Sequence, residues 1–264
     1  MPQTSALLTV MIAAARKAAK GLARDFGEIE NLQVSRKGPG DFVTASDHKS
    51  EKVLFEELSK ARPGYGFLME ERGAVEGSDK THRFIVDPLD GTMNFMHGVP
   101  HFSISIGLER DKELVAGVVY DVIKDEMFWA EKGAGAYVNA KRLRVSSRKD
   151  IAEALVVTGV TPATVRDEAR RAQFEAELSR VNARAAGLRR FGSAALDLCY
   201  VAAGRLDAYW ERDLSSWDIA AGAIIVREAG GFVRELDGGD FMQTGSILAA
   251  NEKLFEPMQK LVRG

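Results

Sequence analysis

Two aspartates three residues apart, Asp87 and Asp90, have the type and spacing of a metal site. They lie in residues 84–95, FIVDPLDGTMNF, where a short apolar run indicates a buried strand and Pro88 favours a turn directly after it. We expect this turn to place both carboxylates around one point, with the Leu89 carbonyl oxygen between them. Oxygen ligands in a compact turn suit a hard cation such as Mg²⁺.

The two residues after this turn favour an anion beside the metal. Gly91 and Thr92 are expected to open a helix, whose unpaired N–H groups and positive dipole end would face the carboxylates. Phosphate binds readily at such a helix start. Carboxylates that hold a metal beside an anion site are typical of phosphoryl transfer. The alternative for an isolated D-P-L-D-G-T segment is that both aspartates only shape the turn and cap the helix.

Three further acidic segments favour the metal site over that alternative. Residues 41–47, DFVTASD, place two acids and two hydroxyls around a predicted helix start. Residues 66–71, GFLMEE, indicate a strand that ends in paired acids, and Trp217-Asp218 opens a helix rich in alanine and glycine. One such segment would be ordinary, but four in one chain indicate a shared site.

The composition excludes several other classes of protein. The 264 residues carry 36 Lys and Arg against 38 Asp and Glu, so no general basic field exists to attract nucleic acid or an acidic membrane. With 45% hydrophobic residues, the chain is not largely disordered. A single cysteine, Cys199, excludes a disulfide framework and favours a reducing cytoplasm. The apolar run at residues 6–15 is too short to span a bilayer, so we expect no membrane association.

Motifs of several common chemistries are absent from the sequence. It contains no G-x-S-x-G nucleophile elbow, no Walker phosphate loop and no dinucleotide-binding G-x-G-x-x-G. His97 and His101 have a glycine and a proline between them, so they do not share a helical face as zinc ligands would. We expect both histidines to be structural. Carboxylate chemistry is what remains.

The elements that must position these carboxylates change along the chain. Helices are expected at residues 5–26 and 47–61, followed by antiparallel strands between residues 65 and 145. In the second half, strands alternate with helices. The strands are expected at residues 155–157, 206–211 and 247–250, and the helices at residues 163–182, 193–203, 217–229 and 252–262.

This order of elements predicts a layered fold of mixed α+β and α/β character. We expect an N-terminal lobe over residues 1–145, which carries the metal site. A C-terminal lobe over residues 146–264 would complete the substrate site. No flexible linker marks the boundary, so the two lobes are expected to form one compact unit.

Five segments together resemble one known family, the inositol monophosphatases. They are GDFVTASD (40–47), FLMEERG (67–73), FIVDPLDGTMNFMHGVPHFSISIGL (84–108), RRFGSAALDLCYVAAGRLDAYWE (189–211) and WDIAAGAIIVREAGG (217–231). The pairing of D-P-L-D-G-T with W-D-x-A-A-G is highly specific, and R-R-x-G-S-A-A-L-D-L is most similar to bacterial inositol-1-monophosphatases. The resemblance implies an α-β-α-β-α layered sandwich of the sugar-phosphatase type, a homodimer, and Mg²⁺-dependent, lithium-sensitive phosphatase activity.

Matched position by position, the resemblance implies three groups of site residues. Those implied in catalysis are Asp47, Glu70 and Thr92, with the Thr92–Asp47 pair orienting and deprotonating the attacking water. Those implied for the first Mg²⁺ are Glu70, Asp87 and the Leu89 carbonyl, and those for the second are Asp87, Asp90 and Asp218. A third, more weakly bound ion would lie near Glu70. The implied substrate contacts are Leu89, Asp90, Gly91, Thr92, Arg189, Gly192, Ser193, Ala194, Glu211 and Asp218.

The sequence departs from the family pattern at three places. Met69 stands where the family usually has glycine, so we expect a bulkier approach to the metal. Arg36 replaces a common lysine near the mouth of the site, and residues 213–216 differ from the usual loop beside the substrate. Arg190, next to the implied substrate contact Arg189, is expected at a dimer interface.

The expected function is therefore Mg²⁺-dependent hydrolysis of a small polyol phosphate, with inositol monophosphate as the first candidate. Related folds host histidinol-phosphatase, fructose-1,6-bisphosphatase and nucleotide 3′-phosphatase activities, and these stay open as alternatives. A different class of alternative is a non-catalytic role in binding transcription or ribosome-assembly partners, as some bacterial relatives do.

Overall fold

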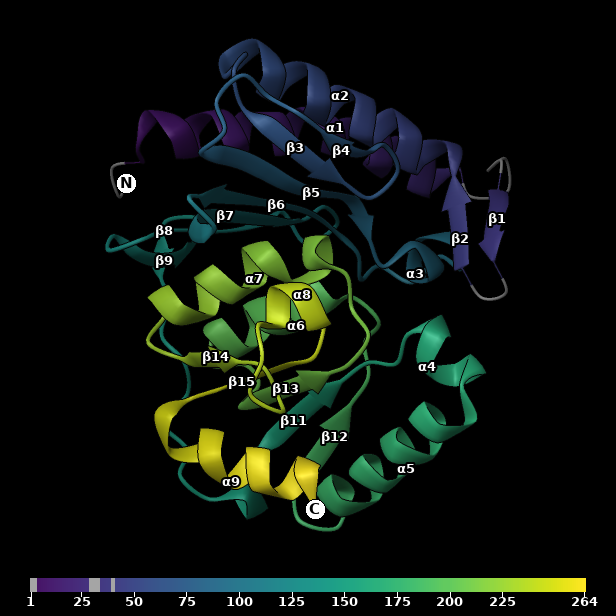
Figure 1. The fold of residues 1–264 in the computed structure, drawn as a ribbon, viewed down its shortest axis with the longest axis vertical. Helices are drawn as coiled ribbons and strands as arrows, with labels where there is room; N and C mark the ends of the chain where they lie inside the picture. Colours follow the sequence, from purple (N-terminus) through teal and green to yellow (C-terminus); the bar gives the residue numbers. More distant parts are fainter. Residues whose placement is uncertain (1–3, 29–33, 39–40) are drawn as a thin grey trace.

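The computed structural model describes residues 4–28, 34–38 and 41–264, and for residues 34–38 and 41–43 it describes the backbone alone. In the described chain, two large sheets alternate with layers of helices (Figure 1). This arrangement confirms the predicted α-β-α-β-α sandwich. Among the same residues, no helix combines the length and the apolarity needed to cross a membrane.

The first helical layer consists of two capped helices. α1 (Ala6–Gly27) begins after Ser5, whose hydroxyl accepts a helix N–H, and its buried residues return every three or four positions. α2 (Ala45–Ala61) begins after Thr44, which forms a capping box with Asp47. The two helices lie side by side against one face of the first large sheet (Figure 1). The cap of α2 therefore also fixes a predicted catalytic residue.

A short antiparallel hairpin connects these helices. Its strands are β1 (Val34–Gly38) and β2 (Asp41–Thr44). The chain breaker predicted at residues 38–40 falls partly on Pro39 and Gly40, which lie outside the described residues. Because β2 ends at the residue that caps α2, the hairpin leads directly into the helix start that carries Asp47.

The first large sheet has the strand order β10-β9-β8-β7-β6-β5-β3-β4. Its strands are β3 (Gly66–Met69), β4 (Gly73–Val75), β5 (His82–Asp90), β6 (Ser103–Arg110), β7 (Glu113–Asp121), β8 (Glu126–Glu131), β9 (Gly135–Val138) and β10 (Lys141–Arg142). Neighbouring strands are antiparallel, as predicted, except for the parallel pair β3 and β5. That exception brings the carboxyl ends of β3 and β5 to the same edge of the sheet.

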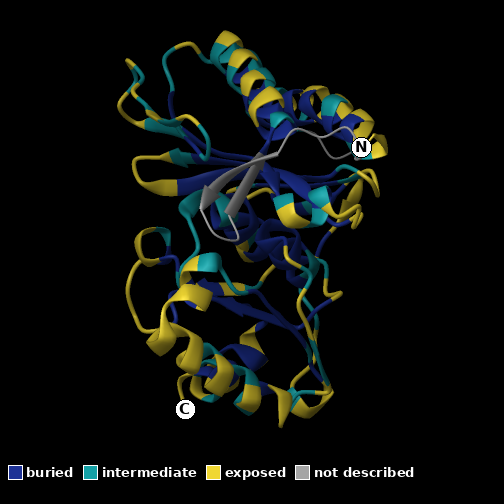
Figure 2. Cartoon of the chain, turned by 90° about the vertical axis from the view of Figure 1, so that its right-hand side faces the viewer, coloured by how far each residue is buried: buried dark blue, intermediate teal, exposed yellow. Residues whose placement is uncertain are grey.

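The middle layer consists of α6 (Ala194–Ala202) and α7 (Ser216–Glu228), which are buried along most of their length. Such helices are apolar on nearly every side. Gly107 in β6 and Gly117 in β7 let α7 approach closely, since a Cβ at Gly107 would lie 2.8 Å from the Ala220 Cβ. Figure 2 shows the result: the sheets and the central helices are buried, whereas the outer helices expose one side.

The second large sheet has the strand order β12-β11-β13-β15-β14. Its strands are β11 (Leu155–Thr158), β12 (Gly187–Arg189), β13 (Ala208–Glu211), β14 (Phe232–Arg234) and β15 (Ile247–Ala250). β11 is parallel to β12 and β13, so the carboxyl ends of β11 and β13 lie at one edge. The remaining helices are α3 (Thr92–Met96), α4 (Pro162–Arg166), α5 (Glu168–Asn182), α8 (Phe241–Thr244) and α9 (Glu252–Arg263). Of these, α5 and α9 form the outer layer (Figure 1).

The single helix predicted at residues 163–182 is wrong, because α4 and α5 separate at Asp167. Asp167 has an extended backbone (φ −92°, ψ 120°), and its carboxylate accepts the Arg170 N–H at 3.0 Å. An aspartate that caps a following helix competes with continuation of the preceding one. Pro162, at the start of α4, lines the cleft described below.

The two sheets fall on either side of the predicted lobe boundary, since the first ends at Arg142 and the second begins at Leu155. One hydrophobic cluster nevertheless spans both sheets. It joins Val119 of the first sheet, through α6 and α7, to Tyr209 of the second. The two halves of the chain thus share a core, and a site formed between them has packed walls on both sides.

Candidate active site

A cleft of about 230 Å³ is lined by residues from both halves of the chain. The first half contributes the end of β5 and the start of α3, and the second contributes the starts of α6 and α7. The sequence-predicted residues in the lining are Glu70, Asp90, Gly91, Thr92, Gly192, Ser193, Ala194, Glu211 and Asp218. The predicted residues Asp47, Asp87 and Leu89 are buried.

The parallel pairing of β3 with β5 brings two acids to one edge of the first sheet. In this register, the residues that follow the last paired positions are Glu70 and Asp87. The pairing of β5 with β6 then shifts between Asp87 and Asp90, as expected for a turn at D-P-L-D. Asp87 Oδ1 accepts the Leu89 N–H at 2.9 Å, so one of the acids holds the turn itself.

Asp90 is held by donors from both halves of the chain. Its Oδ2 accepts a short hydrogen bond from the Ser193 hydroxyl and one of 3.0 Å from the Ala195 N–H at the start of α6. From the first sheet, the Ser103 hydroxyl lies 3.4 Å from the same oxygen. Ser193 thus contacts the carboxylate of a residue that lies 103 positions earlier in the sequence.

The acids of the cleft raise one another's pKa values. Burial raises the pKa of Asp87 well above its usual range, and the neighbouring carboxylates of Glu70, Asp90 and Asp218 raise it further. Burial likewise raises the pKa of Asp218, with Asp90 as the largest charged contributor. The pKa of Asp90 rises to about 6, chiefly through burial, although its hydrogen-bond donors oppose the shift.

This donor set suits a hard divalent cation. Four carboxylates that destabilise one another's ionised forms would be stabilised together by a cation, and oxygen donors are what Mg²⁺ prefers. Asp218 is positioned for such a role because its Oδ2 accepts the Ser215 N–H at 2.7 Å, which fixes the start of α7. Among the described residues, no three Asp, Glu, His or Cys side chains form a closed metal-binding cluster. The fit therefore rests on charge and oxygen chemistry.

Thr92 and Asp47 meet beside these acids. The Thr92 hydroxyl lies 3.2 Å from Asp47 Oδ1 and 3.0 Å from the Leu89 carbonyl oxygen. The other oxygen of Asp47 accepts the Thr44 N–H at 2.8 Å and the Thr44 hydroxyl. Burial raises the pKa of Asp47, and Glu71 adds to the shift, whereas the Thr44 donors lower it. A carboxylate oriented in this way can hold a hydroxyl and accept a proton through it.

Glu211 enters the cleft from the carboxyl end of β13. Its Oε2 accepts the Tyr209 hydroxyl at 2.8 Å, and its carboxylate lies against Gly159 at the end of β11. A Cβ at Gly159 would lie 2.1 Å from Glu211 Oε2, so a larger side chain there would displace this carboxylate. Burial raises the pKa of Glu211 to about 7, and Asp90 contributes to the same shift.

Two turns with left-handed glycines come together at the mouth of the cleft. Gly91 has φ 95° and Gly192 has φ 84°. The Asn94 side-chain amide joins the turns, because its Nδ2 donates to the His101 carbonyl at 2.8 Å and to the Phe191 carbonyl at 2.7 Å. The structure thus confirms the helix predicted after Gly91, and the predicted phosphate-binding turn is fixed to the predicted substrate loop.

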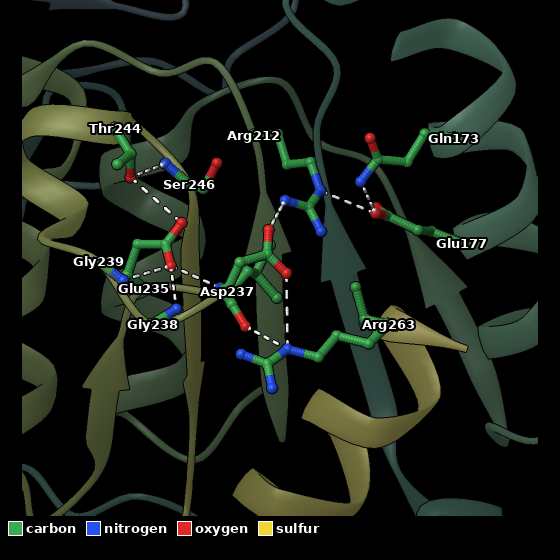
Figure 3. A network of polar contacts seen from close by, with 12 residues as sticks. Gln173, Glu177, Arg212, Glu235, Asp237, Gly238, Gly239, Thr244, Ser246 and Arg263 are labelled. Carbon is green, nitrogen blue, oxygen red and sulfur yellow. Dashed lines mark hydrogen bonds and ion pairs between the residues drawn. The ribbon is translucent and has the colours of Figure 1, made fainter. Parts of the chain in front are cut away.

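A polar network behind the cleft holds the end of β13 (Figure 3). Arg212, the residue after Glu211, donates to Glu177 Oε1 at 2.8 Å and to Asp237 Oδ2 at 2.7 Å. Glu177 is buried and also accepts the Trp210 Nε1–H at 3.1 Å. Because the guanidinium ties α5 to β13 and to the segment after β14, Glu211 is presented from a fixed strand.

The two neighbouring arginines lie in different places. Arg190 lines the cleft, and its charge lowers the pKa of Glu211. Arg189, the predicted substrate contact, is exposed and is not among the lining residues; its Nη1 donates to the Leu188 carbonyl at 2.9 Å. The difference arises because Arg189 is still the last residue of β12, whereas Arg190 follows the strand end.

The departures from the family pattern also have structural outcomes. Met69 is fully buried in the core beneath the sheet and does not line the cleft, so the expected bulk at the metal approach is absent. In residues 213–216, Asp213 has φ 60° and accepts the Thr164 hydroxyl at 2.7 Å, and Leu214 lines the cleft. The side chain of Arg36 lies outside the described residues.

Residues 159–162 line the cleft and were missed by the sequence reasoning. A signal for them exists in the sequence. Gly159-Val160-Thr161-Pro162 follows the strand Leu155–Thr158 directly, and its glycine and proline mark a turn. Ligands of α/β sheets bind beyond the carboxyl ends of parallel strands. Recognising that the strands ending at residues 158 and 211 run in parallel would have placed this turn beside Glu211.

Comparisons of the sequence and the structure with those of known proteins identify the family of this chain. The model of the inositol monophosphatase family matches residues 3–263. The inositol-1-monophosphatase of Mesorhizobium japonicum is 55% identical over 98% of this chain and 97% of its own. The crystal structure of the extragenic suppressor protein suhB from Bartonella henselae superposes with a TM-score of 0.94 at 50% identity, covering 98% of this chain and 99% of that one. The Nus factor SuhB of Haemophilus influenzae is 42% identical over 97% of this chain and 96% of its own.

Proposed function

The chain belongs to the inositol monophosphatase family, and on that premise we propose that it hydrolyses a small polyol phosphate monoester with Mg²⁺. Myo-inositol monophosphate, cleaved to inositol and phosphate, is the proposed substrate. One observation carries the proposal: Glu70, Asp90, Thr92 and Glu211 line one cleft, and the buried Asp47 contacts Thr92 directly behind it.

The proposed metal ligands follow the donor set of the cleft. Glu70, Asp87 and the Leu89 carbonyl would hold one Mg²⁺, and Asp87, Asp90 and Asp218 would hold a second. A third, weaker ion is proposed near Glu70. When bound, Mg²⁺ would lower the pKa of the attacking water and neutralise charge on the phosphoryl oxygens and on the leaving oxygen.

The residues of the chain orient the attacking water and the phosphate. We assign Glu70 and Thr92 to positioning the water, with Asp47 accepting its proton through the Thr92 hydroxyl. The raised pKa of Asp47 supports this role, because a base is most effective when its pKa lies close to the working pH. The N–H groups of Gly91 and Thr92 would bind the phosphoryl oxygens. Attack would proceed in line with the leaving oxygen.

The other wall of the cleft suits a ligand rich in hydroxyl groups. Glu211 offers carboxylate oxygens to sugar hydroxyls, and Ser193 and Ala194 line the cleft next to it. At about 230 Å³, the cleft is smaller than the roughly 300–1,000 Å³ typical of pockets for drug-sized ligands, which favours a compact substrate. Arg190 in the lining is a better candidate for a contact with substrate than Arg189.

Phosphate release from a panel of substrates tests the proposal. The panel contains inositol-1-phosphate, fructose-1,6-bisphosphate, histidinol phosphate and adenosine 3′,5′-bisphosphate, each with Mg²⁺, and Asp90→Asn serves as the blank. We expect the highest kcat/KM with inositol-1-phosphate. A higher value with another member of the panel would reject the substrate, and no release from any member would reject the catalytic proposal.

A second candidate function is binding to a transcription complex. The relative from Haemophilus influenzae that is named a Nus factor supports it at 42% identity. Affinity purification of the wild-type protein and of Asp90→Asn, each from cells of its own source, would test it. Equal recovery of RNA polymerase with both proteins would support a role independent of catalysis, and recovery with neither would reject it.

We further propose that the protein is a cytoplasmic homodimer. The resemblance to the family and the single buried cysteine support this assignment. Light scattering coupled to size exclusion measures the assembly directly. The expected mass is twice the 28.8 kDa of one chain, and a mass of one chain at micromolar concentration would reject the dimer.

A further inference from the structure

Beneath the cleft, three buried polar atoms without a hydrogen-bond partner lie together. They are His101 Nε2 and both carboxylate oxygens of Asp197. The Asp197 residue is 1% exposed and His101 is 9% exposed. Only two other side-chain atoms in the described part of the chain share this condition. Because an unpaired buried polar group is costly, such a cluster needs an explanation.

The spacing of the two side chains fits one molecule between them. His101 Nε2 lies 4.0 Å from Asp197 Oδ1, which is too far for a direct hydrogen bond. Two hydrogen bonds of about 2.8 Å to a single oxygen span that distance when they meet at about 90°, which is tighter than tetrahedral, so a bridging oxygen would sit close to both groups. The rings of Phe191 and Tyr200 cover His101, with centroids 5.2 Å and 5.6 Å from the imidazole. Bulk solvent is therefore kept away.

Burial opposes charge on both members of the pair. Burial raises the pKa of Asp197 well above its usual range, and the nearby carboxylates of Glu211 and Asp90 raise it further. Burial lowers the pKa of His101 to about 4, with Lys124 contributing in the same direction and Asp121 opposing. Burial thus disfavours the charged form of both side chains. A hydrogen-bonded link, rather than an ion pair, is then the way to satisfy them.

Asp197 is one step away from Ser193, which holds Asp90, and His101 is one step away from Asn94, which fixes the Gly91 turn. On α6, the Asp197 N–H donates to the Ser193 carbonyl at 2.9 Å, and the Ser193 hydroxyl donates to Asp90. In the first half of the chain, the His101 carbonyl accepts the Asn94 amide that fixes the Gly91 turn. A link between Asp197 and His101 thus closes a path around the cleft from α6 to the phosphate-binding turn.

We propose that Asp197 and His101 are joined through one buried water molecule and act as a positioning pair, which holds α6 against the turn at Gly91 and sets the affinity of the cleft for its substrate. The kinetic part of this inference rests on the proposed phosphatase function. Neither side chain lines the cleft, so neither acts as a catalytic residue. Loss of the link should weaken substrate binding more than turnover.

Substitutions of similar shape distinguish loss of the hydrogen-bonded link from a disturbance of packing. Asp197→Asn keeps groups that can bind the same water, so we expect its KM to stay within about twofold of the wild type. Asp197→Leu removes the link and should raise KM about five- to tenfold, with kcat within about twofold. Cys199→Ala, in the same buried helix but away from the pair, should lower stability without changing KM.

A double variant tests whether the two residues act together. Because each single leucine substitution breaks the same link, Asp197→Leu with His101→Leu should raise KM no further than either change alone. Additive effects on KM would overturn the proposal. So would an Asp197→Asn variant with the KM of Asp197→Leu.

A spectroscopic readout keeps the proposal testable without turnover. In the wild-type protein, we expect a nuclear Overhauser effect between the His101 ring and a long-lived water. We also expect the Nε2 nitrogen resonance of His101 to move in Asp197→Leu and to stay in place in Cys199→Ala. These signals would support the pair even if the panel of substrates rejected the phosphatase function. Absence of the water signal in the folded wild-type protein would overturn it.

Discussion

The hydroxyl of Ser193 donates a hydrogen bond to Oδ2 of Asp90 across the interface between the two halves of the chain. The same oxygen accepts the Ala195 N–H at 3.0 Å, so the start of α6 is hydrogen-bonded to an acid at the end of a strand of the first sheet. Asp90 is one of the proposed ligands for Mg²⁺. The geometry of the cleft is therefore a product of the whole fold and not of the D-P-L-D-G-T segment alone.

Removal of this hydroxyl should weaken catalysis. We expect Ser193→Ala to lower kcat/KM about tenfold, because a hydrogen bond to a charged group contributes roughly 1.5–3 kcal/mol. Ser103→Ala is the matched control, since its hydroxyl lies 3.4 Å from the same oxygen and should matter less than threefold. Steady-state phosphate release measures both variants. Equal losses in the two would contradict the assigned role of Ser193.

Loss of the Thr92 hydroxyl should lower turnover and leave binding largely intact. Thr92→Val keeps the shape of the side chain but removes the group that lies 3.2 Å from Asp47. We expect kcat to fall by roughly 10²–10³, within the range attributed to a positioned acid or base. Asp47→Asn should cause a similar fall, and Thr92→Ser should retain most activity. A Thr92→Val variant with normal kcat would remove this pair from the mechanism.

Much of this fold follows from the sequence, and the exceptions have physical causes. The capped helix after Thr44 and the strand–turn–helix around Asp87 were predictable because caps, turn residues and apolar runs act locally. The break at Asp167 was missed because charged residues continue on both sides of it without a clear apolar periodicity, and the capping bond to the Arg170 N–H marks it. Local patterns therefore identify elements better than their ends.

The candidate site shows the same division. Two of its acids, Asp87 and Asp90, could be assigned from local spacing alone. Their partners in the second half required the resemblance to a family, because nothing local connects Glu211 or Ser193 to them. The adjacent arginines could not be separated by sequence, since only the end of β12 decides that Arg190 lines the cleft. The Asp197–His101 cluster left no sequence signal, because it arises from packing between α6 and the chain before β6.

The raised pKa of Glu211 predicts how stability depends on pH. Its pKa is about 7 in the folded protein against 4.5 for an ordinary glutamate, so the folded state retains a proton that the unfolded state has lost. This group therefore costs no stability below about pH 4.5, and its cost grows as pH rises to about 7. Glu211→Gln should become more stable than the wild type across that window, by on the order of 2 kcal/mol.

Urea unfolding in the presence of a chelator, at pH 4.5 and at pH 8, measures this difference. The exposed Glu252→Gln on α9 is the control for the loss of a surface carboxylate. Comparing each variant with the wild type at the same pH cancels the contributions of titrating groups that do not interact with the substituted residue. A stability gain in Glu211→Gln that shrinks as pH rises would contradict the assigned shift.

Gly91 should tolerate no side chain, because its turn leaves little room for a Cβ, and Gly133 serves as the control for backbone strain alone. Its φ of 95° is unfavourable for alanine, and a Cβ would lie 3.1 Å from the His101 carbonyl oxygen. Gly133 has φ 80° but nothing within 4 Å of a Cβ. Both alanine variants should lose about 1–2 kcal/mol of stability from the left-handed backbone. Only Gly91→Ala should lose more than about tenfold in kcat/KM, because its turn must also shift. Equal activities would contradict the role of this turn.

The most direct test of the central claim is phosphate release from inositol-1-phosphate as a function of Mg²⁺ concentration, for the wild type and for Asp90→Asn. The claim is that the acids around this cleft support metal-dependent hydrolysis. We predict saturable activity in the wild type that a chelator abolishes, and a loss of at least about 10³-fold in the variant. Wild-type activity that persists in chelator, or an Asp90→Asn variant that matches the wild type, would contradict it.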